Sequence, residues 1–266
     1  MKIYPTDLTD SQWLKIEKFF TKRKRKHSLR KIVNALLYIT KSGVQWRMLP
    51  HSYPNWKLVY YYFRRWTAEG LIEEIHDWLR SYCRKQAGRK ESPSLGLLDS
   101  QSVKSSCITL EKGYDAGKKV TGRKRHIITD TMGFILAIVI HRADIQDRDG
   151  AKLVLKELQY RYPLLKKILA DGGYKGTLIE WTLSLFGWTL EIVHKVAGIS
   201  TFRVIPKRWV VERTFGWFNF NRRLAKDYEA ISDYSIAFVQ MAMIRIMLNR
   251  IKKYNLDNLL VIFEPQ

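Results

Sequence analysis

Along the first ninety residues, apolar side chains recur every three or four positions, which is the period of an amphipathic helix. The pattern divides into four segments, at residues 9–20, 28–43, 55–70 and 71–86. Thr9 and Gln12 have the spacing of a capping box at the start of the first segment. Ser28 and Asn55 are suited to cap the second and third segments, and Gly43 is suited to end the second. We therefore predict four consecutive helices.

The third of these helices carries its apolar residues in one stripe, with basic and aromatic side chains on or beside the opposite side. These side chains are Lys57, Tyr61, Arg64 and Arg65. Two helices, a turn and a basic third helix are typical of a helix-turn-helix DNA-binding unit. A small bundle with a solvated basic face fits the pattern equally well. We assign any reading of DNA bases to these four residues.

The hydrophobic period changes after residues 86–94, a polar stretch with Gly and Pro that is typical of a linker. Short apolar runs there predict strands, and longer segments with the helical period predict helices. The predicted strands are residues 95–103, 118–130, 134–143, 166–173 and 188–193, and the predicted helices are residues 147–163, 177–186, 206–225 and 235–251. This order predicts an α/β domain over residues 91–266, with helices covering a mixed sheet, after a helical DNA-binding domain over residues 1–90.

The charge of the chain points to a partner. The 266 residues include 47 Lys and Arg against 25 Asp and Glu, which gives a net charge of +22. Residues 1–90 hold 20 basic and 7 acidic side chains and the remainder holds 27 and 18, so both parts are basic. Because Lys and Arg on phosphates release condensed counterions, double-stranded DNA is the expected partner. A solubilising surface or an anionic membrane surface are the alternatives.

Two features argue against a membrane-spanning or disulfide-stabilised protein. The longest unbroken apolar run, from Phe134 to Ile140, is far shorter than the roughly 20 residues that span a bilayer. The two cysteines, Cys83 and Cys107, cannot form a disulfide framework. We therefore expect a reduced, cytoplasmic protein that is associated with the nucleoid through its DNA partner and has no membrane partner.

Two aspartates follow short apolar strands in the same way. Asp99 ends the apolar part of the first predicted strand, and Asp171 ends another and precedes Gly172 and Gly173. Ligands bind at the carboxyl ends of strands in open sheets, and glycines allow close approach of the backbone. Each aspartate alone could be a turn former. The shared pattern indicates a common site.

A third carboxylate lies on the helix predicted for residues 206–225. Glu212 follows Arg208 by one helical turn, and an exposed ion pair between the two is the simplest explanation. Large apolar residues leave little of this helix free to be a plain surface, however, and Arg222 and Arg223 continue its basic side. We interpret Glu212 as a site residue beside cations that would face an anionic substrate.

The predicted strand around GRKRH carries three consecutive cations. Side chains alternate along a strand, so Arg123 and Arg125 project together while Lys124 faces away. We predict that Arg123 and Arg125 contact DNA phosphates. A solvated strand face is the alternative.

Several segments together resemble one family. They are LLDSQSVKSS, GRKRHIITDTMGF, ILADGGYKG and RWVVERTFGWFNFNRRLAKDYE in the second part, and YPTDLTDSQWLKIEKFF, GVQWRMLP and WKLVYYYFRRW in the first. As a set they resemble the DDE transposases of bacterial insertion sequences, in the insertion-sequence-five group, over essentially the whole chain. The resemblance implies an RNase-H-like catalytic fold whose acidic triad falls on Asp99, Asp171 and Glu212.

The same resemblance implies a chemistry. Three converging carboxylates repel one another, and two Mg²⁺ ions, which Mn²⁺ could replace, would relieve the repulsion. Such a site would cleave a DNA phosphodiester at an element end and join the 3′-OH to target DNA, on a homodimer or higher synaptic oligomer. Arg208 fits the family pattern, but Ile205 and Asn219 stand where the pattern asks for Tyr and Lys. Arg222 or Arg223 could take over their DNA contacts.

Two other functions fit parts of this sequence. A non-catalytic DNA-binding repressor would use the helical part alone, and a test for Mg²⁺-dependent nicking would separate it from a transposase. A nuclease or resolvase of the same fold would cut DNA without joining it. The transfer of a pre-cut 3′-OH end to a plasmid would distinguish that enzyme.

Overall fold

A computed structural model of the chain describes residues 4–21, 26–193 and 209–262, of which residues 252–262 are described by their backbone only. It divides into two compact units. The helical unit contains the chain up to Arg89, Phe220–Leu224 and the chain from Ala237, and the sheet unit contains Lys90–Asn219 and Ala225–Ile236. The sheet unit begins at Lys90, and the chain from Ala237 groups with the N-terminal helices.

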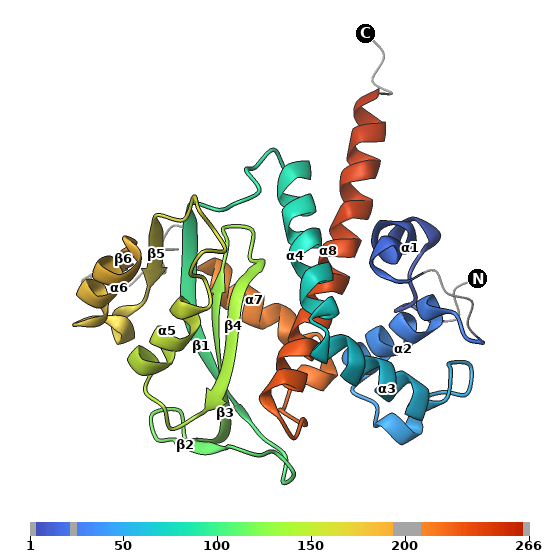
Figure 1. The fold of residues 1–266 in the computed structure, drawn as a ribbon, viewed down its shortest axis with the longest axis horizontal. Helices are drawn as coiled ribbons and strands as arrows, with labels where there is room; N and C mark the ends of the chain where they lie inside the picture. The colour runs from blue at the N-terminus through green and yellow to red at the C-terminus, as the bar shows by residue number, and fades with distance from the viewer. Residues whose placement is uncertain (1–3, 22–25, 194–208, 263–266) are drawn as a thin grey trace, which may run out of the picture. The chain divides into compact units, whose positions relative to one another are not determined.

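The helices of the helical unit begin and end close to the predicted positions. They are α1 (Asp10–Ile16), α2 (Leu29–Ser42), α3 (Trp56–Ala68) and α4 (Leu71–Gln86), with the 3₁₀ turns η1 (Glu17–Phe19) and η2 (Trp46–Met48) (Figure 1). Thr9 Oγ1 accepts a hydrogen bond from the Gln12 backbone N–H at 3.1 Å, and Asn55 Oδ1 accepts one from Lys57 at 2.9 Å. Gly43 follows α2 with a φ of 70°, a left-handed conformation that glycine adopts without strain.

The link between α2 and α3 is longer than the turn of about 3–4 residues in a compact helix-turn-helix. It runs from Gly43 to Asn55 and contains η2. The Trp46 ring of η2 lies 4.9 Å from the Tyr60 ring and 5.5 Å from the Phe63 ring, both on α3. The link therefore packs against α3.

The last helix, α8 (Ser232–Ile262), supplies part of the core of the helical unit. Between Ala237 and Ile251 most of its side chains are buried, as predicted for a helix that is apolar nearly all round. Phe238 stacks on Phe63 of α3, with ring centroids 4.6 Å apart. Among the residues that the structure describes, no helix, α8 included, is both long and apolar enough to cross a bilayer.

The sheet unit is built on a mixed sheet. Its strands are β1 (Leu95–Lys104), β2 (Gly113–Asp115), β3 (Val120–Thr129), β4 (Ile135–Arg142), β5 (Lys167–Ala170) and β6 (Thr189–Ile192). β1 pairs antiparallel with β3 and parallel with β5, which pairs parallel with β6. β3 also pairs antiparallel with β2 and β4. The predicted hairpin and the other predicted strands are confirmed, and the short β2 was not predicted.

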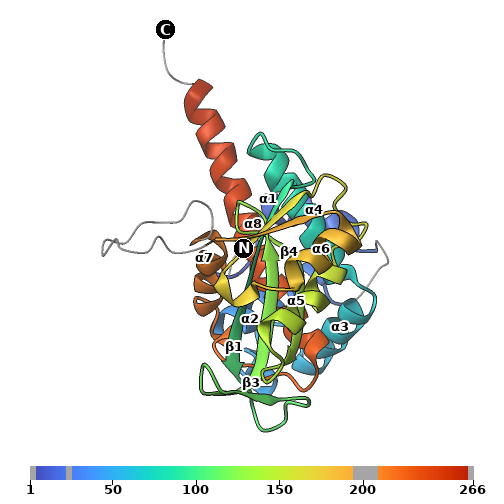
Figure 2. The same ribbon diagram turned by 90° about the vertical axis from the view of Figure 1, so that its left-hand side faces the viewer.

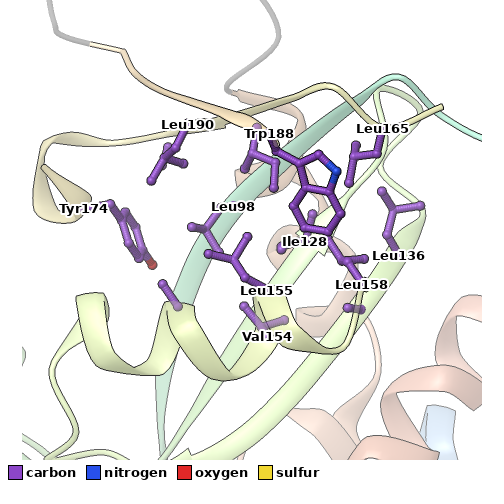
Figure 3. Packing of buried hydrophobic residues seen from close by; sticks show 14 of the residues in the cluster. Leu98, Ile128, Leu136, Val154, Leu155, Leu158, Leu165, Tyr174, Trp188 and Leu190 are labelled. Carbon is purple, nitrogen blue, oxygen red and sulfur yellow. The ribbon is translucent and has the colours of Figure 1, made fainter. Parts of the chain in front are cut away.

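Helices cover both faces of this sheet. Over one face lie α5 (Asp147–Lys156) and α6 (Leu178–Phe186), where Leu98 of β1 and Val154 of α5 belong to one buried cluster (Figure 3). α7 (Trp209–Asn219) packs against β1 and β3 on the other face (Figure 2). The predicted α/β class, a helical region followed by a mixed sheet flanked by helices, is confirmed.

α5 is shorter than the predicted helix, which extends to residue 163. It ends at Lys156. Tyr160 has a φ of 65°, and a right-handed helix cannot include a residue in this left-handed region. The Tyr162 hydroxyl instead donates to the Leu136 carbonyl at 2.9 Å, so the segment after α5 is held to the sheet through the buried Leu158 and Tyr162.

α7 also ends before its predicted limit at residue 225. Its last residue is Asn219, and Phe220–Leu224 belong to the helical unit. There the Phe220 carbonyl accepts a hydrogen bond from Lys41 Nζ of α2. The start predicted at residue 206 lies outside the described residues, which resume at Trp209.

Candidate active site

Asp99 lies in β1, and Asp171 directly follows β5, the strand that pairs with β1. β1 and β5 are parallel, with Leu97 beside Leu169. If this register is continued by two residues, Asp99 of β1 comes opposite Asp171, which directly follows β5. The carboxyl end of β5 and the middle of β1 therefore present one carboxylate each.

Both carboxylates point to the face of the sheet that α7 covers. The residues that precede them, Leu98 and Ala170, are buried in the cluster under α5 and α6. Side chains alternate along an extended chain, and Asp171 is still extended, with φ −83° and ψ 179°. Asp99 and Asp171 therefore project away from α5, toward the side on which α7 packs.

Local hydrogen bonds orient each carboxylate. Asp99 Oδ1 accepts from the Ser100 backbone N–H at 2.7 Å. Asp171 caps the 3₁₀ turn η3 (Gly172–Tyr174), and its Oδ1 accepts from the Gly173 N–H at 2.9 Å. A Cβ atom at position 173 would lie 3.0 Å from that oxygen, so a glycine here leaves room for the carboxylate. The close approach involves Gly173 alone, because a Cβ atom at position 172 would meet nothing within 4 Å.

Glu212 lies in the first turn of α7, and its side chain is exposed. Two hydrogen bonds hold α7 to the turn between β3 and β4: Thr214 Oγ1 donates to the Gly133 carbonyl at 2.8 Å, and Arg213 Nη2 donates to Met132 at 3.0 Å. In the described part of the chain, which includes all three acids, no group of three or more His, Cys, Asp or Glu is placed to hold a metal ion. Glu212 as the third ligand therefore stays a prediction.

The negative charges of nearby aspartates affect the pKa of the Tyr174 hydroxyl. Burial raises its pKa well above the ordinary value, and the charges of Asp99, Asp147 and Asp171 raise it further. Burial would also raise the pKa of Asp147, but hydrogen bonds from Lys124 and other nearby groups outweigh it and lower that pKa. Several carboxylates thus act on one small region, where a cation would be stabilised.

A buried polar network lies behind the aspartates, and the sequence patterns did not reveal it. Its members come from β1, β3, β4, α5 and η3, and they are Ser100, Lys124, His126, His141, Asp147 and Tyr174. The alternation of side chains along β3 is the sequence signal that could have revealed this network. Lys124 and His126 alternate with Arg123 and Arg125 and share the face of Ile128, an apolar core residue. Polar groups on a core face need partners, which marks them as a network.

The four cations and aromatics predicted to read DNA bases lie on the outer side of α3. All four side chains are exposed, and they are Lys57, Tyr61, Arg64 and Arg65. On the side opposite them, Val59, Phe63 and Trp66 are buried. The division of α3 into two sides is confirmed, and its contact with DNA stays a prediction.

The two β3 arginines expected on phosphates are instead buried, with Arg123 1% exposed and Arg125 2% exposed. Arg123 Nη1 lies 3.3 Å from Asp227 Oδ2, and its Nη2 donates to the Leu110 and Ala230 carbonyls at 2.6 and 2.7 Å. Burial lowers the pKa of Arg125 to about 10. A guanidinium enclosed in this way is not placed to contact a phosphate, so this prediction needs correction.

The arginines after α7 do not continue its basic side as predicted, because η4 (Arg222–Leu224) belongs to the helical unit. Arg222 is exposed, whereas Arg223 is buried with its guanidinium 5.0 Å from the Phe238 ring centroid. Arg208 and Ile205 lie outside the described residues, and Asn219 is exposed at the end of α7. Of the predicted phosphate contacts near α7, the structure thus presents Arg222 on the surface.

The sheet unit is an α/β domain in which helices cover both faces of a mixed sheet, with Asp99 in β1 and Asp171 directly after β5. Residues 90–247, more than half of the chain, match the family described as "Transposase DDE domain". The chain belongs to this DDE transposase family. Residues 8–76 match a second family, described as "Putative transposase of IS4/5 family".

A curated relative extends this comparison. The chain is 27% identical over 143 residues to the "Putative transposase for insertion sequence element IS402" of Burkholderia cepacia. The matched region covers 50% of this chain and 65% of that protein, so the match spans a little under two thirds of the relative's length. The expected family is therefore confirmed.

Proposed function

We propose that this protein is an insertion-sequence transposase that binds the element ends, cleaves the DNA phosphodiester there and joins the 3′-OH to target DNA. The observation that supports the proposal is the parallel pairing of β1, which contains Asp99, with β5, which Asp171 directly follows, in a DDE domain. An aspartate pair of this kind offers oxygen ligands at one point of the sheet, where a DNA backbone could be brought to both.

The donor set suits a hard divalent cation. Carboxylate oxygens are the ligands that Mg²⁺ takes in proteins, and the charges of Asp99 and Asp171 already act together on Tyr174. We propose that these two residues, with Glu212 as the third, hold two Mg²⁺ ions, which Mn²⁺ could replace. When bound, the ions would neutralise the carboxylates and supply Lewis acidity at the scissile phosphate.

Each of the three acidic residues is carried by a different element of secondary structure. Asp99 is held inside a strand that pairs on both sides, and Asp171 is held at the start of η3. Glu212 projects from a helix that two hydrogen bonds join to the β3–β4 turn. These residues orient the reacting groups, and no covalent enzyme intermediate is required.

DNA binding is assigned to the helical unit in this proposal. The exposed side of α3 supplies candidate base contacts through Lys57, Tyr61, Arg64 and Arg65. Arg222 is a further exposed cation of the same unit, and the net charge of +22 favours any DNA surface. Two ends would be held by a homodimer or a higher synaptic oligomer.

The central test is Asp99→Asn, which keeps the shape of the side chain and removes its charge. We expect Mg²⁺-dependent cleavage of an element end and transfer of a pre-cut 3′-OH end to fall by more than about 10³-fold, with DNA affinity unchanged. Asp149→Asn is the matched control, because Asp149 lies on the exposed side of α5 and pairs with Lys152.

Three outcomes contradict the proposal in different ways. Transfer that survives Asp99→Asn would rule out this residue as a catalytic ligand. Cleavage by the wild-type protein without any joining would identify a nuclease or resolvase. DNA binding without Mg²⁺-dependent cleavage or joining would identify a repressor.

A further inference from the structure

Tyr174 closes the turn that begins at Asp171. The residues between them, Gly172 and Gly173, are exposed, and a Cβ atom at position 172 would meet nothing within 4 Å. Tyr174 is 1% exposed, and in Figure 3 its ring lies in the apolar cluster with the hydroxyl directed toward α5. The two glycines give the turn little packing of its own, so its position depends on how its ends are held.

The Tyr174 hydroxyl is the first member of a buried hydrogen-bond chain. Its oxygen lies 2.8 Å from His126 Nε2. His126 Nδ1 lies 3.1 Å from His141 Nε2, and His141 Nδ1 lies 2.8 Å from the Arg142 carbonyl oxygen. The chain thus runs from η3 across β3 to β4.

The donor and the acceptor of each hydrogen bond in this series can be assigned by starting from the Arg142 carbonyl oxygen. A carbonyl oxygen can only accept, so His141 donates from Nδ1 to Arg142. Burial lowers the pKa of both histidines, so each is neutral near pH 7 and has one donor and one acceptor nitrogen. His141 Nε2 therefore accepts from His126 Nδ1, and His126 Nε2 accepts from the Tyr174 hydroxyl. The hydroxyl proton of Tyr174 therefore forms the hydrogen bond to His126 Nε2.

The first half of α5 packs tightly against the two histidines of this hydrogen-bond series. Gly150, in the first half of α5, faces both rings: a Cβ atom there would lie 2.4 Å from His141 Nε2 and 2.5 Å from His126 Nδ1. Such distances are far below van der Waals contact, so any other residue would displace the rings. The backbone of α5 therefore fixes the two imidazoles between itself and the sheet.

The chain reaches both predicted metal ligands through neighbouring residues. Tyr174 ends the turn that Asp171 begins, and the charges of Asp99 and Asp171 both raise the pKa of its hydroxyl. Ser100, the residue after Asp99, donates from Oγ to Asp147 Oδ1 at 2.9 Å and belongs to the same buried network. A shift of Tyr174 would therefore act directly on the turn that begins at Asp171.

We propose that Tyr174, His126 and His141 are positioning residues that hold the Gly172–Tyr174 turn so that Asp171 stays beside Asp99. This inference rests on the proposed function, because positioning matters only if the two aspartates bind metal ions. Groups that orient metal ligands through hydrogen bonds commonly change metal affinity by about 10–100-fold when they are lost.

The first test is Tyr174→Phe, which removes one oxygen and keeps the buried ring. We expect the dissociation constant of the full-length protein for Mn²⁺, measured by paramagnetic resonance, to rise about 10-fold or more, with DNA-end affinity unchanged. Tyr160→Phe is the matched control, because Tyr160 is 92% exposed. It should bind Mn²⁺ as the wild-type protein does.

The second test separates positioning from plain packing. In His126→Gln the amide oxygen can accept from Tyr174, whereas in His126→Phe no acceptor remains. We expect the Gln variant to retain most of the Mn²⁺ affinity and the Phe variant to lose as much as Tyr174→Phe, with circular dichroism confirming that each is folded.

Wild-type Mn²⁺ affinity in folded Tyr174→Phe and His126→Phe would overturn the inference while leaving the proposed function intact. Failure of the proposed function gives a different result. In that case the wild-type protein and Asp99→Asn would bind Mn²⁺ equally poorly, and neither would cleave DNA.

Discussion

Arg64 on α3 and Arg123 on β3 both belong to runs of consecutive basic residues, yet their side chains differ in exposure to solvent. Arg64 is exposed on the outer side of its helix. Arg123 is 1% exposed and is bound to Asp227 and to the carbonyls of Leu110 and Ala230. In the helical unit the basic run is a surface, whereas in the sheet unit it is part of the core.

This difference shows what net charge can and cannot indicate. The value of +22 counts every Lys and Arg equally, although a buried cation serves the fold and contributes little to the surface field. Arg123 ties residues 225–236 to β3, because Asp227, Ala230 and Ser235 all lie within reach of its guanidinium. The basic runs of α3 and β3 should therefore respond differently to substitution.

The largest difference is expected in stability. Arg123→Ala leaves Asp227 buried without its cation, and we expect the free energy of unfolding to fall by about 3–5 kcal/mol. Urea denaturation followed by circular dichroism measures this. Arg64→Ala is the control at an exposed site and should change the free energy by less than about 0.5 kcal/mol.

A double-mutant cycle sharpens this prediction. In Arg123→Met with Asp227→Asn no buried charge of the pair is left alone, so the double variant should be more stable than the sum of the single losses predicts. Additive losses would mean that the two side chains act independently, and the contrast between β3 and α3 would then rest on burial alone.

Local signals explain why so much of the fold could be predicted. The Thr9 capping box and the Asn55 N-cap form the predicted hydrogen bonds, and Gly43 ends α2 as expected. These signals involve residues only a few positions apart. The limits of α5 and α7 could not be predicted in the same way, because Tyr162 is held by a carbonyl on β4 and Phe220 by a lysine on α2.

In the candidate site, too, features that depend on neighbouring residues could be predicted, and features that depend on distant residues could not. The pattern of an apolar strand followed by an aspartate singled out Asp99 and Asp171 as candidates, and β1 and β5, the strands that lead to them, pair in parallel. The burial of Arg123 could not be foreseen, because its partner Asp227 lies 104 positions away in the sequence. His126 and His141 pair across a hairpin, and strand period alone does not show which face is covered by α5.

The next effect concerns DNA recognition by α3. If Arg64 reads a base, Arg64→Ala should weaken binding to an element end by about 1–3 kcal/mol and leave binding to a scrambled end little changed. Competition binding with the two duplexes measures the difference. Equal weakening on both would make Arg64 a phosphate contact, with a smaller salt dependence of binding as its sign.

The smallest effect extends the comparison from arginine to histidine. Burial, helped by the nearby His141, lowers the pKa of His126 from 6.5 to about 3, so the native state keeps this residue neutral where the unfolded chain takes up a proton. Because the unfolded state then binds more protons, stability is fully present above pH 6.5 and is lost as the pH falls toward 3.

Between pH 6.5 and about 5.5 this group alone should remove about 1 kcal/mol from the free energy of unfolding. His126→Gln cannot take up the proton, so its stability should fall less over the same interval, as thermal denaturation at several pH values would measure. His51→Gln, at an exposed position of the helical unit, is the control and should follow the wild-type slope. An unchanged slope in His126→Gln would mean that His126 is protonated in the folded protein. The bond from Tyr174 to His126 Nε2 would then have to run in the opposite direction.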